Sequence, residues 1–263
     1  MSIITLNDLQ PADILAIWQR VESPIAPLWG RVGWSFEGNG IRTRTTFIQA
    51  FNALGLSFIE LPNLLKTAER AEDLAGYLDP FYDLYVVRES NHEKLATFAA
   101  CSSKPVINAM SSQGHPCEVL TDAFFINKTL GPIKQVRICL WGPTTNVFKS
   151  WHELAPLLGL DLTHVCDEAF HTQTPGVKFT TKADFNTDVV ITDGWPTACQ
   201  SAYPLTLAIL QALDNPLLLP TPPFTVGQEL DFDPLLYTNF AGYHQKAWLL
   251  PVQKAVIAHL LTA

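Results

Sequence analysis

The sequence has few charged residues, and negative charges outnumber positive ones. Of 263 residues, 16% are charged and 48% are hydrophobic, so the chain can bury a large core. Lysine and arginine together number 17 against 25 aspartates and glutamates, which gives a formal net charge of -8. Because nucleic acids are held by basic surfaces, this balance argues against nucleic acid as a main partner. A small anion bound in a local basic pocket remains compatible with it.

Cysteines are also scarce, and their spacing argues against two common roles. They are five in number, lie far apart and form no CxxC pair. That pattern argues against a disulfide framework and against a zinc site. We expect most of them to be buried thiols. They are Cys101, Cys117, Cys139, Cys166 and Cys199.

Long apolar runs are absent as well. No stretch reaches the roughly 18 uncharged apolar residues that a membrane span needs. The opening MSIITLNDLQ lacks a basic start followed by an apolar stretch, so it does not resemble a secretion signal. We therefore expect a soluble, cytoplasmic protein with no membrane partner. The length fits either one large domain or two of ordinary size.

What the sequence does contain is an alternation of helical and extended patterns. Residues 6–21 have helical apolar spacing with a proline near the start. Strand-like and helical runs then alternate, which predicts a parallel sheet covered by helices. The strand-like runs lie at 31–37, 56–62, 82–88 and 104–110, with helical runs at 47–55, 91–100 and 118–130.

The alternation restarts after residue 130, which suggests a second domain. A new strand is predicted at 135–141, next to GPIK, and the alternation continues to residue 195. The predicted fold class is therefore α/β, with two domains, each a parallel sheet covered by helices, and the active site in the interdomain crevice. The predicted domains are 1–130 and 131–240, followed by a C-terminal helix at 241–263 that packs back on the first domain.

The stretch EGNGIRTRTTF, Glu37 to Phe47, combines two glycines, two arginines and a helical run. The first turn of a helix exposes unpaired N–H groups and a partial positive charge, so it suits an anion. Arg42 and Arg44 would add full charges there. The alternative is that Gly38 and Gly40 form a tight turn and that both arginines are surface residues.

Ligands of open parallel sheets lie at the carboxyl ends of the strands, and here those ends are followed by polar residues. The set contains arginines, asparagines, a histidine and an aspartate, which we expect to converge on a crevice between the two domains. Its members are Arg42, Arg88, Asn108, His115, Asn146 and Asp193.

Five ordered stretches resemble one enzyme family. FEGNGIRTRTTF is similar to the Phe-x-x-x-Ser-x-Arg-Thr-Arg-x-x-Phe signature of the aspartate and ornithine carbamoyltransferases. VVR, VINAMSSQGHPCEVLTD, the pair GPTTNV and TDGW, and the final VQKAVIAHLL resemble further segments of that family in the same order. The resemblance implies transfer of a carbamoyl group from carbamoyl phosphate to the amine of an ornithine-like amino acid, with no metal and no cofactor.

The resemblance also implies roles for individual residues. Arg42, Thr43, Arg88 and His115 would be catalytic, placing donors around the phosphate and the carbonyl oxygen. The amino acid would be held by Asn146, Asp193 and Thr197, and a loop carrying Lys66 would reach a neighbouring subunit of a homotrimer. The carbamoyl phosphate set is Gly40, Ile41, Arg42, Thr43, Arg88, His115, Glu118, Thr221 and Pro222. Residues 1–130 would form the carbamoyl phosphate-binding domain and 131–240 the amino-acid-binding domain.

Each of these residues also has an ordinary structural interpretation. His115 precedes a proline and could cap a helix, Asn146 could be an N-cap, and Asp193 could pair with a lysine. The chain also departs from the family pattern. Gly40 and Ile41 stand where the family has serine and threonine.

Two later departures add to this difference. Glu118 replaces a glutamine and would repel a phosphate dianion unless it is protonated or paired. Thr221 replaces a cysteine of the ornithine branch. Two hypotheses therefore stand: a carbamoyltransferase, or a catalytically weak or inactive relative that binds an anionic metabolite or a partner protein.

Overall fold

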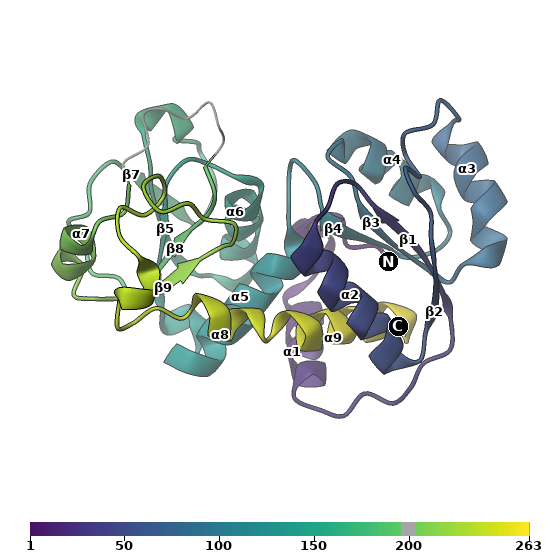
Figure 1. The fold of residues 1–263 in the computed structure, drawn as a ribbon, viewed down its shortest axis with the longest axis horizontal. Coiled ribbons are helices and arrows are strands. Elements are labelled where there is room, and N and C mark those ends of the chain that lie inside the picture. The colour runs from purple at the N-terminus through teal and green to yellow at the C-terminus, as the bar shows by residue number, and fades with distance from the viewer. Residues whose placement is uncertain (196–203, 263) are drawn as a thin grey trace. The chain divides into compact units, whose positions relative to one another are not determined.

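The computed structural model describes residues 1–195 and 204–262, and it divides into two compact units. The first unit comprises Met1–Thr121 together with Ala247–Ala263, and the second comprises Asp122–Lys246. The division falls within helix α5 (Pro116–Leu130), some residues before the boundary predicted at 130. Figure 1 shows the elements of each unit with the labels used below.

The first unit is built on a four-stranded parallel sheet in the order β2-β1-β3-β4. The central pair is in register from Val32 opposite Leu84 to Phe36 opposite Arg88, so β1 and β3 end side by side. All four strands fall within the predicted strand-like runs. They are β1 (Arg31–Phe36), β2 (Ser57–Glu60), β3 (Leu84–Arg88) and β4 (Val106–Met110).

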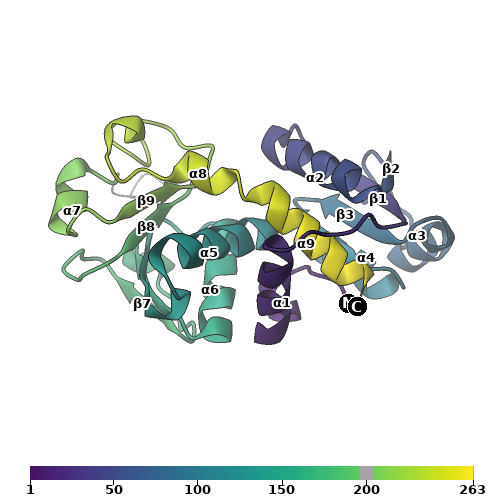
Figure 2. The same ribbon diagram turned by 90° about the horizontal axis from the view of Figure 1, so that it is seen from below.

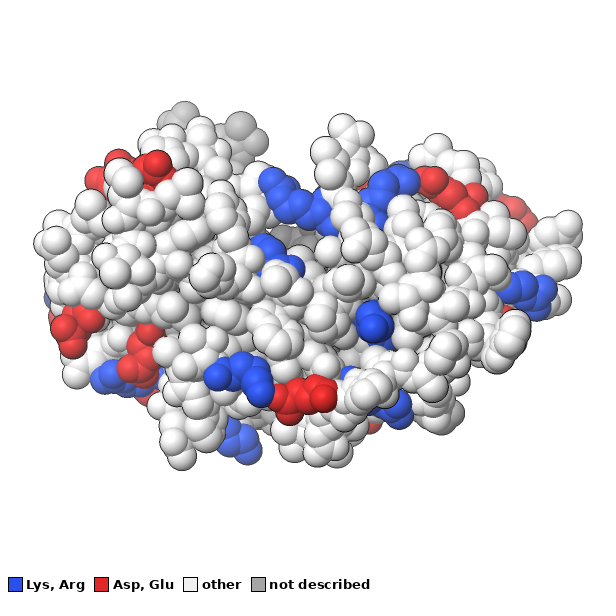
Figure 3. Space-filling model, turned by 60° about the horizontal axis from the view of Figure 1, so that its bottom comes forward, with Lys and Arg blue, Asp and Glu red and all other residues white. Residues whose placement is uncertain are grey.

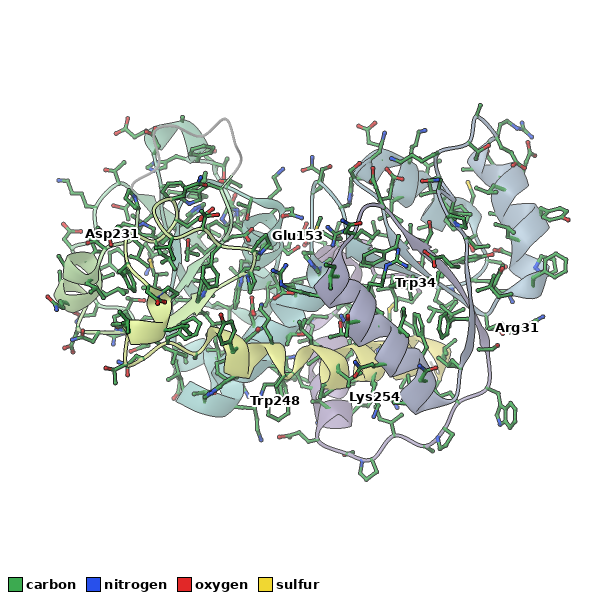
Figure 4. All side chains as sticks on the ribbon, viewed as in Figure 1. Arg31, Trp34, Glu153, Asp231, Trp248 and Lys254 are labelled. Carbon is green, nitrogen blue, oxygen red and sulfur yellow. The ribbon has the colours of Figure 1, made fainter. Side chains whose placement is uncertain are left out.

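Helices cover both faces of this sheet. On one face, Tyr85 and Val87 pack in a buried cluster with Phe98 of α4 (His92–Cys101) and Ala75 of α3 (Ala71–Leu78). On the other face, Trp34 contacts Phe47 and Phe51 of α2 (Ile41–Leu54), with ring centroids 5.9 and 5.5 Å apart. Figure 4 labels Trp34 within the first unit.

The C-terminal helix α9 (Leu249–Leu261) belongs to the first unit. It packs against α2 and α1 (Pro11–Val21), as Figure 2 also shows. His259 Nε2 lies 3.4 Å from Asp13 Oδ1 on α1. Most side chains of α9 are buried, which includes an unbroken run from Ala255 to Leu260.

The second unit holds a five-stranded parallel sheet in the order β7-β6-β5-β8-β9. One face carries a buried cluster that includes Trp141, Val165 and Val190. On the opposite face, His164 contacts Phe148 of α6 (Asn146–Leu158). The strands are β5 (Arg137–Trp141), β6 (Asp161–Val165), β7 (Val177–Thr180), β8 (Val189–Thr192) and β9 (Leu217–Pro220).

The remaining helices of the second unit are short. They are the α-helices α7 (Leu207–Ala212) and α8 (Gly242–Lys246) and the single-turn 3-10 helices η3 (Ile133–Gln135), η4 (Glu168–Phe170) and η5 (Pro234–Leu236). Gln245 of α8 donates a hydrogen bond to the buried Asp122 of α5, which fastens these two helices to each other. The first unit has two further 3-10 turns, η1 (Leu6–Asp8) and η2 (Asp79–Phe81).

One predicted element has a different start. The helix predicted at 6–21 begins at Pro11, because η1 precedes it and ends at Asp8. Asp13 Oδ2 accepts a hydrogen bond from the Gln10 N–H at 2.8 Å, which fixes the first turn of α1. A proline at the first helical position loses no hydrogen bond, so Pro11 suits this start.

The charged side chains on the surface and the burial of the cysteines agree with what the composition predicted. Charged side chains are widely spaced over the face drawn in Figure 3. Cys117, Cys139 and Cys166 are buried free thiols, as predicted, while Cys101 is partly exposed and Cys199 lies outside the described residues. No helix in the described part of the chain is both long and apolar enough to cross a membrane.

Candidate functional site

In the first unit, the carboxyl end of β1 leads directly into the start of α2. Gly40 is the N-cap residue and has left-handed backbone angles, φ 31° and ψ 39°. No side chain caps the helix, so its first N–H groups are left to a ligand or to water. The Arg44 N–H donates to the Gly40 carbonyl at 2.9 Å, which closes the first turn around Arg42 and Thr43.

The two arginines of this turn have different surroundings. Arg44 Nη1 lies 2.8 Å from Glu60 Oε1, and its guanidinium lies 5.1 Å from the centroid of the Phe36 ring. Arg44 therefore has a structural role, and the prediction that both arginines serve an anion is not supported for it. Arg42 is exposed and forms no ion pair with the described residues. It is the cation of this turn that remains available.

Arg88 lies at the end of β3, beside the same corner. Its guanidinium is 5.2 Å from the centroid of the Phe36 ring, so Phe36 contacts two cations, Arg88 and Arg44. Burial lowers the pKa of Arg88, and Glu37 acts in the opposite direction. The ordinary pKa of arginine is above about 12, so Arg88 stays charged at neutral pH.

Gly40 is required by the close packing of this corner. A Cβ atom there would fall on the Phe36 ring and would lie 2.9 Å from Arg88 Nη1. The serine of the family signature has no room at this position unless Phe36 moves. The chain departs from the family signature by lacking this hydroxyl. The position of the Phe36 ring accounts for the departure, because the ring occupies the space that a serine would need.

Lys66 lies in a network of its own unit. Its Nζ is 2.6 Å from Glu89 Oε1 and 3.1 Å from Glu37 Oε1. Glu89 is buried, at 3% exposure, and also accepts a hydrogen bond from the Asn91 N–H at 2.9 Å. Glu37 Oε2 accepts from the Ser90 N–H at 2.6 Å. The network thus joins the ends of β1 and β3 to the loop that follows β2.

This network controls the charge of Glu37. Hydrogen bonds from Ser90 and the neighbouring Lys66 lower the pKa of Glu37 from 4.5 to about 2. Glu37 and Glu89 follow β1 and β3, so both lie near the predicted anion site. Lys66 is the cation that offsets their negative charges. The predicted contact of Lys66 with a neighbouring subunit stays a prediction.

His115 and Glu118 lie at the start of α5. The His115 carbonyl accepts hydrogen bonds from the N–H groups of Glu118 and Val119, at 3.1 and 3.2 Å, so His115 starts the helix as its ordinary interpretation required. The side chains of His115 and Glu118 are buried, at 7% and 6% exposure. Burial and the Glu118 charge raise the pKa of the Cys117 thiol to about 12.

Asn108 on β4 holds the loop that leads to His115. It is fully buried, and its Nδ2 donates to the Ile4 carbonyl at 2.8 Å and to Ser111 Oγ at 3.1 Å. The Ser111 N–H in turn donates to the Gly114 carbonyl at 2.9 Å. Asn108 therefore positions the segment that carries His115.

In the second unit, Asn146 follows β5 at the first position of α6. The N-cap is Thr145, whose Oγ1 accepts from the Phe148 N–H at 3.2 Å, so the alternative that Asn146 is the N-cap is wrong. Asn146 Oδ1 accepts a hydrogen bond from the Val147 N–H at 3.1 Å. Its side chain is partly exposed at the carboxyl end of the sheet.

The loops after β8 and β9 lie against each other. The Thr221 N–H donates to the Thr192 carbonyl at 2.7 Å, and a Cβ on Gly194 would lie 2.7 Å from the Pro223 carbonyl oxygen. Asp193 is buried, at 9% exposure, and its Oδ1 accepts from the Gly194 N–H at 2.9 Å. Asp193 and Thr221 are thus brought to one end of the second sheet. The Pro222–Pro223 peptide bond is cis.

Glu229 ties these two loops together. It is buried, at 2% exposure, and accepts hydrogen bonds from the N–H groups of Trp195 at 2.7 Å and Thr225 at 2.6 Å. The predicted Thr197 lies outside the described residues. Sequence reasoning missed Glu229, as it missed the Glu37 and Glu89 partners of Lys66, because neither long-range contact leaves a local pattern.

A buried histidine pair supports the loop between β5 and α6. His164 Nε2 lies 2.8 Å from the Gly142 carbonyl, so this nitrogen carries the proton and donates. His164 Nδ1 must then accept from His152 Nε2, 3.1 Å away. Burial lowers the pKa of His152 to about 3 and that of His164 to about 4. Both imidazoles are therefore neutral at physiological pH.

We expect acid to destabilise the second unit through this pair. Unfolded histidines bind protons below about pH 6.5, whereas these two resist protonation down to their lower folded pKa values. The contribution of this pair to the free energy of unfolding is thus largest above pH 7, and it falls as the pH drops from 6.5 towards 4. Between pH 7 and 5 the loss should be about 2 kcal/mol per histidine. Urea unfolding at several pH values measures it.

A matched pair of variants isolates the effect. His164→Phe should flatten the dependence on pH, whereas the exposed His244→Asn should leave it unchanged. An equal slope in wild type and His164→Phe would contradict the assignment.

The described residues contain no cluster of histidine, cysteine and acidic side chains suited to a metal ion. The polar groups that the structure brings together are instead Arg42, Thr43 and Arg88 in the first unit, and Asn146, Asp193 and Thr221 in the second. Guanidinium groups and a helix start suit an anion. A carboxylate and an amide that follow strands of one sheet suit the α-ammonium and α-carboxylate of an amino acid.

Comparison with known proteins identifies the family. Residues 2–128 match the carbamoyl-P binding domain of aspartate/ornithine carbamoyltransferase. An ornithine carbamoyltransferase of Caulobacter vibrioides is 31% identical over 192 residues, which cover 67% of this chain and 62% of the relative. Residues 2–128 therefore form a domain of the aspartate/ornithine carbamoyltransferase family. An ornithine carbamoyltransferase of Psychrobacter cryohalolentis extends the similarity, at 27% identity, over 97% of this chain and 92% of its own length.

The two-domain α/β fold of the carbamoyltransferase family is likewise confirmed. The crystal structure of ornithine carbamoyltransferase from Burkholderia thailandensis superposes with a TM-score of 0.89 and covers 99% of this chain and 98% of its own. At 21% identity this likeness shows the fold. The chain spans 62% of the length of the Caulobacter relative in this alignment.

Proposed function

We propose that the protein transfers the carbamoyl group of carbamoyl phosphate to the amine of an ornithine-like amino acid. The observation that carries the proposal is the match of residues 2–128 to a carbamoyl-P binding domain, together with Arg42 at the uncapped start of α2. The matched relatives are named ornithine carbamoyltransferase. The site residues of the second unit suit an amino acid of this kind.

In this reaction the acceptor amine attacks the carbonyl carbon, a tetrahedral intermediate forms, and phosphate leaves. Negative charge grows on the carbonyl oxygen and on the departing phosphate, so fixed donors around both lower the barrier. Arg42 and the first N–H groups of α2 would hold the phosphate. Thr43, Arg88 and His115 would donate to the phosphate and the carbonyl oxygen.

The acceptor would bind in the second unit. Asp193 would take the α-ammonium group and Asn146 the α-carboxylate region, with Thr197 nearby in sequence. The backbone carbonyls of Thr221 and Pro222 would accept hydrogen bonds from the carbamoyl NH2 group, since proline lacks the donor but keeps the acceptor. Held in this way, the side-chain amine of the acceptor would meet the carbonyl carbon, and such orientation supplies several kcal/mol of the barrier.

Cytoplasmic location and assembly into a homotrimer are part of the same proposal. They rest on the family resemblance, as does the contact of Lys66 with a neighbouring subunit. The reaction as proposed needs no cofactor. Gly40, Ile41 and Glu118 would line the phosphate region and make its affinity lower than in relatives that carry the hydroxyl and amide side chains.

The proposed function is tested by phosphate release. Purified protein is incubated with carbamoyl phosphate and either ornithine or aspartate, and released phosphate is measured. We expect turnover with ornithine, and little with aspartate because Asp193 would repel its second carboxylate. If carbamoyl phosphate binds but no phosphate is released with either amino acid, the result would favour the alternative that the protein only binds a ligand.

Binding of the phosphate is tested separately through Arg42. Arg42→Ala removes a charge-assisted contact worth about 1.5 to 3 kcal/mol, so calorimetry should show about ten- to a hundredfold weaker binding of carbamoyl phosphate. The matched control is Arg70→Ala, which removes an exposed arginine of the same unit that pairs with Asp73. Equal affinity in wild type and Arg42→Ala would remove Arg42 from the site.

A further inference from the structure

The second unit contains a cavity whose described lining includes neither Asp193 nor Thr221. Its volume is about 270 Å³, and it opens at the carboxyl ends of β5, β6 and β7. This is the end of a parallel sheet at which ligands bind in α/β proteins. The side chains that matter most to its chemistry are Trp141, Cys166, Asp167, Phe170, Ala183 and Ile209.

The cavity exists because one connection of the sheet is short. Residues 181–188 join β7 to β8 without a helix, whereas most parallel connections carry one that covers the sheet. The apolar ends of β5 and β6 are instead bordered by Phe170 of η4 and Ile209 of α7. A space that a helix would fill is therefore left open to a small molecule.

The walls are apolar, and one carboxylate borders them. Trp141, Phe170 and Ile209 provide apolar surface, and Asp167 is the acidic side chain of the lining. Asp167 is partly exposed, and its Oδ1 accepts from the Ala169 N–H at 3.0 Å, which fixes the carboxylate at the end of β6. Burial raises the pKa of the Cys166 thiol to about 12, so the cavity contributes no thiolate.

We propose that this cavity binds a small organic amine, with its ammonium group at Asp167 and its apolar body between Trp141, Phe170 and Ile209. Small-molecule sites are concave, mostly apolar and contain few polar groups that fix orientation, which is the arrangement seen here. A carboxylate at the rim selects a cation over a neutral or anionic molecule of the same shape. The site stands independently of carbamoyl transfer, although it shares Gly142 with the loop that leads to Asn146.

Three probes of one shape test the charge requirement. Phenethylamine, phenethyl alcohol and 3-phenylpropionate are titrated into the full chain by ligand-observed NMR. We expect the amine to bind about fivefold more tightly than the alcohol, which is the upper end of what a partly exposed ion pair contributes. The carboxylate should bind most weakly of the three. Equal affinities for all three, or no binding of the amine, would overturn the proposal.

Variants then locate the bound amine. Asp167→Asn should reduce amine affinity to that of the alcohol and leave the alcohol unchanged, whereas Ala183→Trp should fill the cavity and abolish binding of both. Circular dichroism and urea unfolding confirm that each variant is folded. The control is Asp193→Asn, which should not change amine affinity. If Asp193→Asn abolishes amine binding and Asp167→Asn does not, the amine occupies the proposed acceptor site and the inference is wrong.

Discussion

Replacing Gly40 with serine is expected to destabilise the first unit by about 2 to 5 kcal/mol and to weaken phosphate binding. The left-handed conformation costs a residue with a Cβ about 1 to 2 kcal/mol. A further cost of about 1 to 3 kcal/mol arises because the Cβ would displace Phe36, which also contacts Arg88 and Arg44. Urea unfolding measures the stability, and calorimetry with carbamoyl phosphate measures the affinity.

Gly38 offers a matched control for this substitution. It also has a left-handed backbone, with φ +68°, but a Cβ there would meet nothing within 4 Å. Gly38→Ser should therefore incur only the backbone cost and leave phosphate affinity nearly unchanged. Equal losses for the two variants would mean that the Phe36 ring adapts freely and that the serine of the family signature could be restored here.

Lys66→Met should destabilise the first unit by about 1 to 3 kcal/mol and weaken carbamoyl phosphate binding by at least tenfold. The substitution keeps a long apolar stem but leaves the buried Glu89 without its charged partner. It also leaves Glu37 and Glu89 as two uncompensated negative charges near the site of the phosphate dianion. Unfolding and calorimetry measure the two effects.

The control is Arg70→Met, which removes the same charge from an exposed ion pair and should leave stability nearly unchanged. The double variant Lys66→Met with Glu89→Gln should recover much of the phosphate affinity, since it removes one of the uncompensated charges. If Lys66→Met lowers activity but leaves stability and phosphate affinity intact, Lys66 acts outside this network, as a contact with another subunit would require.

The sequence predicted the regular elements well where one periodicity dominates. The strand at 82–88 and the helix at 91–100 correspond to β3 and α4 within a few residues, because each has a clear apolar repeat. Edge elements were harder. The edge strand β7 (Val177–Thr180) has no buried residue, so it leaves no strong alternation in the sequence. The short helices α3 and α7 were not predicted either.

The sequence predicted where the candidate site residues lie in the fold better than it predicted their surroundings. The rule that ligands lie at strand ends located Arg42, Arg88 and Asp193, since strand ends follow from local patterns. It could not separate Arg42 from Arg44, because the difference depends on Glu60, which lies on another strand. Nor could it show that Lys66 pairs with Glu37 and Glu89, two residues far from it in sequence.

The place of α9 has a consequence for synthesis on the ribosome. The helix belongs to the first unit, yet the whole of Asp122–Lys246 is translated between that unit's other elements and α9. At about 5 to 20 residues per second this interval lasts roughly 6 to 25 s. During that time the apolar surfaces of α1 and α2 that α9 covers lie open to chaperones or to other nascent chains. The second unit is continuous in sequence and can complete its core first. The first unit emerges earlier from the ribosome, but its core is completed last, when α9 packs on it.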